Sequence, residues 1–195
     1  RMLTHIMEPH SLGLLLTDLA IVGGLILTAA LFVAAEFALI SLRDSQIRQL
    51  VGRGKRGARV AQLAENPNRF LAAIQVGVTV CGFLSAALGA EKLGDYVIPR
   101  LEGQGLSHGL STTLSIIGVT LIIAYFSLVF GELAPKRLAL FHPEEISLAS
   151  AAAIDVIAKI FRPIIWLLSK STDFVVRAFG VDPKDIFMEL GRRKI

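Results

Sequence analysis

Three long apolar segments, separated by charged ones, dominate the pattern along this chain. They are residues 19–42, 70–90 and 110–131. The second and third segments carry no charged side chain, and the first carries one, Glu36. A helix needs about 20 residues to cross a hydrocarbon layer, and within lipid a helix satisfies its own backbone groups. The pattern therefore predicts an all-α integral membrane protein with three transmembrane helices.

A fourth apolar segment, residues 146–168, has a different character. It is interrupted by four residues that suit lipid poorly: Asp155, Lys159, Arg162 and Pro163. On a helix the three charged residues lie on one side, and burying all of them in lipid costs several kcal/mol. We therefore expect an amphipathic juxtamembrane helix over about 144–170, with Trp166 at the boundary. A fourth span is the alternative, and it would place the basic tail on the opposite side of the membrane.

Charge is distributed unevenly between the two loops that join the spans. Residues 43–69 carry seven Lys or Arg against two acidic residues, whereas residues 91–109 carry two against three. Basic loops face the cytoplasm, so we expect the N-terminus outside and the C-terminus inside. Apolar residues recur at helical spacing on both sides of the glycine-rich residues 52–57, which predicts short helices in the first loop.

Composition supports the membrane interpretation and excludes several classes of protein. Apolar residues make up 53% of the 195 residues and charged residues 18%, where soluble domains carry about a quarter. The net charge of +4 lies mostly in a loop without interleaved aromatic residues, which disfavours nucleic-acid binding. A single cysteine, Cys81, excludes an internal disulfide. The phosphate-loop, zinc-protease and serine-hydrolase motifs are absent, so we expect no enzyme.

Two acidic residues, Glu36 and Glu132, lie within or next to the predicted spans, where an ionisable group is expensive and typical of function. Pro135 lacks the N–H that would bond the carbonyl of Gly131, which leaves a free oxygen beside a carboxylate. Such oxygens are ligands for Mg²⁺ and Ca²⁺. The alternative is an ordinary helix end at which Lys136 anchors the chain at the interface.

The second apolar segment presents a small and polar face at helical spacing. It comprises Gln75, Thr79, Gly82, Ala86 and Gly89, with Ser85 beside it. Such faces let membrane helices approach closely and form hydrogen bonds across the contact. We expect this face to pack against another helix or a second copy of the chain.

Three motifs together resemble a known family. They are Ala-Ala-Glu-Phe-Ala-Leu-Ile-Ser at 34–41, Asn-Arg-Phe-Leu-Ala-Ala-Ile-Gln-Val-Gly-Val-Thr at 68–79 and Gly-Glu-Leu-Ala-Pro-Lys at 131–136. Their order and positions resemble the membrane domain of the CorC/cyclin-M (CNNM) family over roughly residues 10–180. The resemblance implies a Mg²⁺ transporter, often a homodimer, that exports Mg²⁺ in exchange for Na⁺. It also implies a dehydrated ion held between the spans by hydroxyls, carbonyls and the Gly-Glu pair.

The resemblance assigns metal ligands residue by residue. The serine of the first span corresponds to Ser41, and the pair of the third span corresponds to Gly131 and Glu132. Many relatives have an asparagine in the second span, which this chain lacks, so the ligand there is Thr79, Ser85 or a carbonyl near Gly82. Glu36, Pro135 and Lys136 are expected to have structural or gating roles.

The resemblance also sets expectations for the whole protein. Relatives continue into a cytoplasmic regulatory region with nucleotide-binding CBS modules, so residues 181–195 are expected to begin a linker to it. Residues 7–180 are then the transmembrane domain, and Arg1–Ile6 are expected to be foreign to the native chain. We expect a multi-pass protein of a bacterial-type inner membrane, in contact with lipid and not with nucleic acid. A divalent-cation sensor or scaffold without transport, and a carrier of another divalent cation, remain alternative hypotheses.

Overall fold

The structure, a computed structural model, describes residues 9–65 and 67–179, and side chains within 12–65 and 70–179. These residues form helices and short connections and contain no strand. The helices are α1 (Pro9–Ser41), α2 (Asp44–Val51), α3 (Lys55–Glu65), α4 (Pro67–Glu102), α5 (His108–Phe126), the π-helical segment η1 (Ser127–Leu133), α6 (Ala134–Phe141), α7 (Pro143–Ile160) and α8 (Arg162–Ala178). The predictions for Arg1–Ile6 and for residues 181–195 lie outside the described residues.

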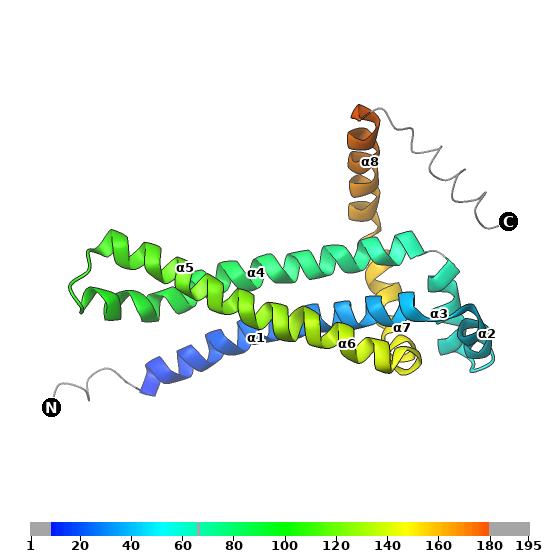
Figure 1. The fold of residues 1–195 in the computed structure, drawn as a ribbon, viewed down its shortest axis with the longest axis horizontal. Helices are drawn as coiled ribbons and strands as arrows, with labels where there is room; N and C mark the ends of the chain where they lie inside the picture. The colour runs from blue at the N-terminus through cyan, green and yellow to red at the C-terminus, as the bar shows by residue number, and fades with distance from the viewer. Residues whose placement is uncertain (1–8, 66, 180–195) are drawn as a thin grey trace.

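Three continuous helical stretches are long and apolar enough to cross a membrane. They are Leu12–Ser41, Phe70–Glu102 and His108–Phe141, the last formed by α5, η1 and α6 together. They run side by side in Figure 1, with the α4–α5 connection at one end and α2, α3 and α7 at the other. We call these the hairpin end and the belt end. The predicted all-α architecture with three spans is confirmed.

The second loop is shorter than predicted. Residues 91–109 were expected to be a loop, but α4 continues through Pro99 to Glu102, and five residues connect it to α5. The charged residues after position 90 mark the end of the apolar surface and not the end of the helix. Pro99 removes the main-chain bond to the carbonyl of Asp95, which is tolerable because both residues are exposed and water can replace the donor.

The first loop forms the two short helices that the apolar spacing predicts. Helix α3 packs closely on α2 at Gly57, where a Cβ atom would lie 1.6 Å from the carbonyl oxygen of Leu50. A glycine is therefore required at this crossing. Gly54, in the turn between the helices, has a φ of 83°, which glycine adopts without strain.

The structure divides the juxtamembrane segment, predicted as one helix over about 144–170, into two helices. Helix α7 ends at Ile160 and α8 begins at Arg162, with Pro163 in its first turn. Proline is accepted in a first turn but not within a continuous helix, so the chain changes direction here. Helix α8 buries none of its residues and extends across the long axis of the bundle (Figure 1).

Two apolar clusters hold the bundle together. At the belt end, Phe70 and Ile74 of α4 and Ile154 of α7 pack with Leu39 of α1 and with residues of α2 and α3. Where the three spans meet, the second cluster contains Val22, Ile26, Val119 and Ile123. Gly89 lies beside this second cluster, because a Cβ there would lie 2.0 Å from the Cδ1 atom of Ile123. One end of the predicted small-residue face is thus a packing contact between α4 and α5.

Candidate functional site

The third span changes its helical register immediately before Pro135. Residues Ser127–Leu133 are π-helical, and the Ala134 N–H donates to the carbonyl of Val129, five residues earlier. The amide that Pro135 lacks would have bonded the carbonyl of Phe130 or Gly131. The wider π register accommodates this missing donor, and the helix continues to Phe141. The predicted break is therefore a local widening, and the helix does not end near residue 131.

Gly131 places the backbone of this widened segment directly against α1. It is buried, and a Cβ atom there would lie 3.5 Å from the Cγ2 atom and 3.6 Å from the carbonyl oxygen of Ile26. The hydroxyl of Ser127 lies 3.5 Å from the same point. A hydroxyl and main-chain oxygens therefore gather where η1 contacts α1.

Lys136 connects the two acidic residues that the sequence singles out. Its Nζ lies 3.6 Å from Oε2 of Glu132, one helical turn earlier, and 5.1 Å from the ring centroid of Phe37. It also interacts electrostatically with Glu36 on α1. Lys136 thus contacts Glu132 and the Phe37 ring at the interface of α1 with the third span, and Glu36 lies within electrostatic range of it. The resulting negative charge favours a cation.

The side chain of Glu132 is 41% exposed, so it is not buried in the protein interior as its position in the sequence suggested. Half exposure leaves the carboxylate room to exchange partners. The described residues contain no group of three acidic, histidine or cysteine side chains that could hold a metal ion. An ion here would therefore need main-chain or hydroxyl oxygens in addition to carboxylates.

The other predicted ligands lie elsewhere. Ser41 is the last residue of α1, and its hydroxyl donates to the carbonyl of Ala38 at 3.0 Å. It lies fifteen residues, about 22 Å of helix, beyond Ile26, which Gly131 contacts. The structure therefore does not bring Ser41 and Gly131 to one ion.

The candidate ligands of the second span are placed differently from one another. Ser85 is buried, and its hydroxyl donates to the carbonyl of Gly82 at 3.0 Å. Thr79 is exposed, and its hydroxyl accepts from Gln75 Nε2 at 3.4 Å. Within the bundle, Ser85 is thus the hydroxyl that faces inward, one turn from the packing contact at Gly89. Thr79 lies on the open part of the small-residue face.

A polar cluster at the hairpin end escaped the sequence analysis. Asp18 Oδ1 lies 3.2 Å from Lys92 Nζ, and the Tyr96 hydroxyl donates to Asp18 Oδ2 at 3.4 Å. The Asp18 side chain is 14% exposed, so these contacts tie α1 to α4 in a largely dry environment. Lys92 and Tyr96 are four residues apart and so lie on one face of a helix. The sequence could have indicated this cluster only if residues 91–102 had been recognised as helical.

Acidic residues of α7 are held by the basic first loop. Glu144 accepts from Gln46 Nε2 at 3.0 Å and lies 3.5 Å from Arg53 Nη1. Asp155 accepts from Lys159 at 2.8 Å, one helical turn later, and lies 4.0 Å from Arg59 Nε. Arg53 and Arg59 of the first loop therefore connect this loop to α7 at the belt end. This contact is separate from the effect of the basic loop on the orientation of the protein in the membrane.

Comparison with known proteins is consistent with this architecture. Residues 20–187 match the family described as the cyclin M transmembrane N-terminal domain, CNNM. The UPF0053 protein sll0260 of Synechocystis is 39% identical over 162 residues, which are 83% of this chain and 36% of that protein. The UPF0053 protein YhdP of Bacillus subtilis is 33% identical over 168 residues, 86% of this chain and 38% of that protein.

A further relative has a name that states an activity. The polyamine export protein of Haemophilus influenzae is 29% identical over 180 residues, 88% of this chain and 41% of that protein. The chain therefore spans less than half the length of each of these three relatives.

Proposed function

This chain belongs to the cyclin M transmembrane (CNNM) family of multi-pass membrane proteins, and from that membership we propose that it is the membrane domain of a transporter that exports Mg²⁺ in exchange for Na⁺. The observation that carries the proposal is the π-helical segment, which presents Gly131 and Glu132 beside α1. Irregular helices inside membranes recur where backbone oxygens coordinate transported ions. Short π-helical segments also occur frequently at functional sites.

The ion would bind between the Glu132 carboxylate and the carbonyls that lack the Pro135 donor. Mg²⁺ takes oxygen ligands in a near-ideal octahedron and gives up its water reluctantly. The Ser127 hydroxyl and the Ile26 carbonyl oxygen lie beside Gly131. Ser85 and the Gly82 carbonyl, on α4, would complete the ligand set if the spans shift. Such a shift would amount to alternating access, because the ion then favours one packing of the spans over the other.

Lys136 acts as an internal competitor in this mechanism. Without a divalent ion, its ammonium neutralises Glu132 at 3.6 Å. An arriving Mg²⁺ displaces it toward Glu36 and Phe37, which already interact with it. When Mg²⁺ leaves, the Lys136 ammonium pairs with Glu132 again, and this pairing favours release of the ion. Ser41, at the far end of α1, would line the path at the belt end.

We place the belt end in the cytoplasm and the N-terminus outside, in a bacterial-type inner membrane, since the basic loop lies at the belt end. The open part of the small-residue face supports a homodimer, because Thr79 is exposed and a Cβ at Gly82 would meet nothing within 4 Å. A CBS-type regulatory region would follow in the full-length protein, which fits the greater length of the relatives.

The decisive experiment measures Mg²⁺ flux in liposomes containing the Glu132→Gln variant, which keeps the side-chain shape and removes the charge. We expect a loss of at least tenfold at equal protein content. Glu145→Gln is the matched control, because that carboxylate is 83% exposed on α7 and should be dispensable. Undiminished flux in Glu132→Gln would refute the assignment.

A polyamine is the second candidate substrate, and one contact in this chain favours it besides the named relative. Lys136 is a primary ammonium on an aliphatic stem, seated between Glu132 and the Phe37 ring. The end of a polyamine has the same chemistry, and an aromatic face attracts such cations. Competition between Mg²⁺ and putrescine or spermidine in the same flux assay separates the two substrates.

The same preparation tests the remaining alternatives. A sensor or scaffold would show thermal stabilisation by Mg²⁺ but no flux. If the chain carries another divalent ion, then Co²⁺, Mn²⁺ or Ca²⁺ should inhibit Mg²⁺ flux at concentrations well below that of Mg²⁺.

A further inference from the structure

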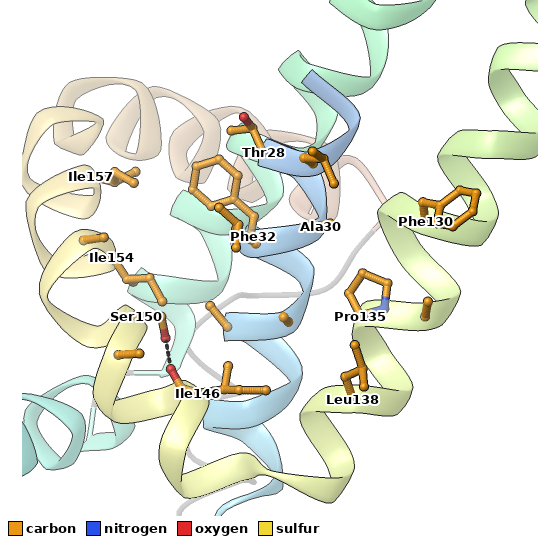
Figure 2. Close-up of a pocket in the computed structure, with 17 residues that line it drawn as sticks. Thr28, Ala30, Phe32, Phe130, Pro135, Leu138, Ile146, Ser150, Ile154 and Ile157 are labelled. Atoms are coloured by element: carbon orange, nitrogen blue, oxygen red, sulfur yellow. Dashed lines mark hydrogen bonds between the residues drawn. The ribbon is translucent and has the colours of Figure 1, made fainter. Parts of the chain in front are cut away.

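An apolar cavity of about 720 Å³ lies between α1, α6 and α7, next to the π-helical segment (Figure 2). This volume is typical of sites that bind small molecules. Its lining includes Leu27, Leu31, Phe130, Leu138, Ile146 and Ile157, and alanines from α1, α6 and α7 form much of the remaining wall. The residues that line it include no charged side chain.

The hydroxyl groups in the lining are already used. Thr28 donates to the carbonyl of Gly24 at 2.8 Å, and Ser150 donates to that of Ile146 at 2.7 Å. Figure 2 shows the second of these bonds beside the cavity. Because both hydroxyls already donate to main-chain carbonyls, neither needs an acceptor on a ligand. The cavity therefore binds an occupant through dispersion contacts with its apolar surface. A polar solute would lose its hydration there without compensation.

The cavity is continuous with the surface that the spans present to lipid. Leu27 and Leu31, at its α1 edge, are 62% and 73% exposed, and Leu138, on α6, is 59% exposed. Leu27 and Leu31 lie near the middle of the first span, well within the depth of the hydrocarbon layer. The material that surrounds the opening of the cavity is therefore lipid.

We propose that this cavity binds one acyl chain of a membrane lipid. A flexible hydrocarbon chain enters a concave space between three helices and follows its irregular wall, whereas a rigid helix of a second copy meets the protruding leucines at its edge. Ala134 and Pro135 form part of the wall, so a bound chain packs against the start of α6, directly after Glu132. Lipid bound here therefore packs against the end of the widened segment, since Phe130 also lines the cavity.

Tryptophan fluorescence in nanodiscs tests the proposal without any transport assay. Trp166 is the only tryptophan in the chain, so Trp166→Phe gives a silent background. Leu138→Trp then reports from the cavity, and Leu121→Trp, on a 65% exposed position of α5 outside the lining, reports from ordinary lipid contact. The probe is a phospholipid brominated on its acyl chain, added at increasing fractions to an unbrominated one.

Leu138 is itself 59% exposed, so both reporters meet the surrounding lipid, and we expect Leu138→Trp to be quenched in addition by the chain in the cavity. Filling the cavity with Ala153→Phe should reduce quenching of the Leu138→Trp reporter at least twofold and leave Leu121→Trp unchanged. Ala149→Leu is a second filling variant, used if circular dichroism shows that Ala153→Phe does not fold. Equal quenching of both reporters, insensitive to filling, would overturn the proposal. A second result would also overturn it: the cavity reporter is not quenched, the protein is a dimer, and the filling variants convert the dimer to a monomer. A second copy of the chain would then occupy the cavity.

Discussion

Replacing Lys136 by methionine should strengthen Mg²⁺ binding, because the ammonium competes with the ion for Glu132. Two unit charges 3.6 Å apart attract by about 5 kcal/mol at the effective dielectric constant of a protein surface. The side chains of Lys136 and Glu132 are 35% and 41% exposed, so screening and lost side-chain entropy reduce this to roughly 1 kcal/mol. Methionine keeps most of the aliphatic stem and removes only the ammonium, which lies over the Phe37 ring.

That free energy corresponds to about a fivefold decrease in the Kd for Mg²⁺, since about 1.4 kcal/mol is a factor of ten. Isothermal titration calorimetry on purified protein measures it directly. Flux should fall in the same variant, because the ion is released more slowly. Arg137→Met is the matched control, since it removes the neighbouring, exposed cation and should leave Kd within about twofold. Unchanged or weaker Mg²⁺ binding in Lys136→Met would refute the role of Lys136 as competitor.

Three further predictions follow from local geometry. Pro135→Ala restores a main-chain donor and should weaken Mg²⁺ binding severalfold by calorimetry, whereas unchanged affinity would show that the freed carbonyls are not ligands. Lys92→Met leaves the mostly buried Asp18 without its charged partner and should lower the free energy of unfolding by roughly 1–2 kcal/mol. Tyr96→Phe removes one hydrogen bond to Asp18 and should lower it less. Equal stability of Lys92→Met and wild type in denaturant titrations would contradict this prediction. Gly57→Ala places a Cβ on the Leu50 carbonyl and should lower the thermal midpoint by several degrees, while Gly13→Ala, in open space, should not.

The number and approximate positions of the spans could be read from the chain because lipid imposes a requirement on length and composition that tertiary contacts hardly alter. Glu36, Glu132 and Pro135 were identifiable for the same reason, since charged and helix-breaking residues are conspicuous within apolar segments. The ends of the helices were less predictable. Charges after residue 90 and around residue 155 mark where apolar surface ends, and helices continue past such points while their backbone bonds remain available.

The proximity of Lys136 to Glu36, one hundred residues apart, depended on how α1 packs on the third span, and no local pattern encodes it. The same holds for the pairing of Asp18 with Lys92 and for the separation of Ser41 from Gly131. By itself, the sequence determined three spans, the acidic residues within or beside them and the irregularity at Pro135, because these follow from hydrophobicity and backbone chemistry. The tertiary structure alone decided that the irregularity is a π-helical widening, that the Lys136 ammonium lies between Glu132 and the Phe37 ring and that an apolar cavity opens nearby. These features result from the packing of helices that are distant along the chain.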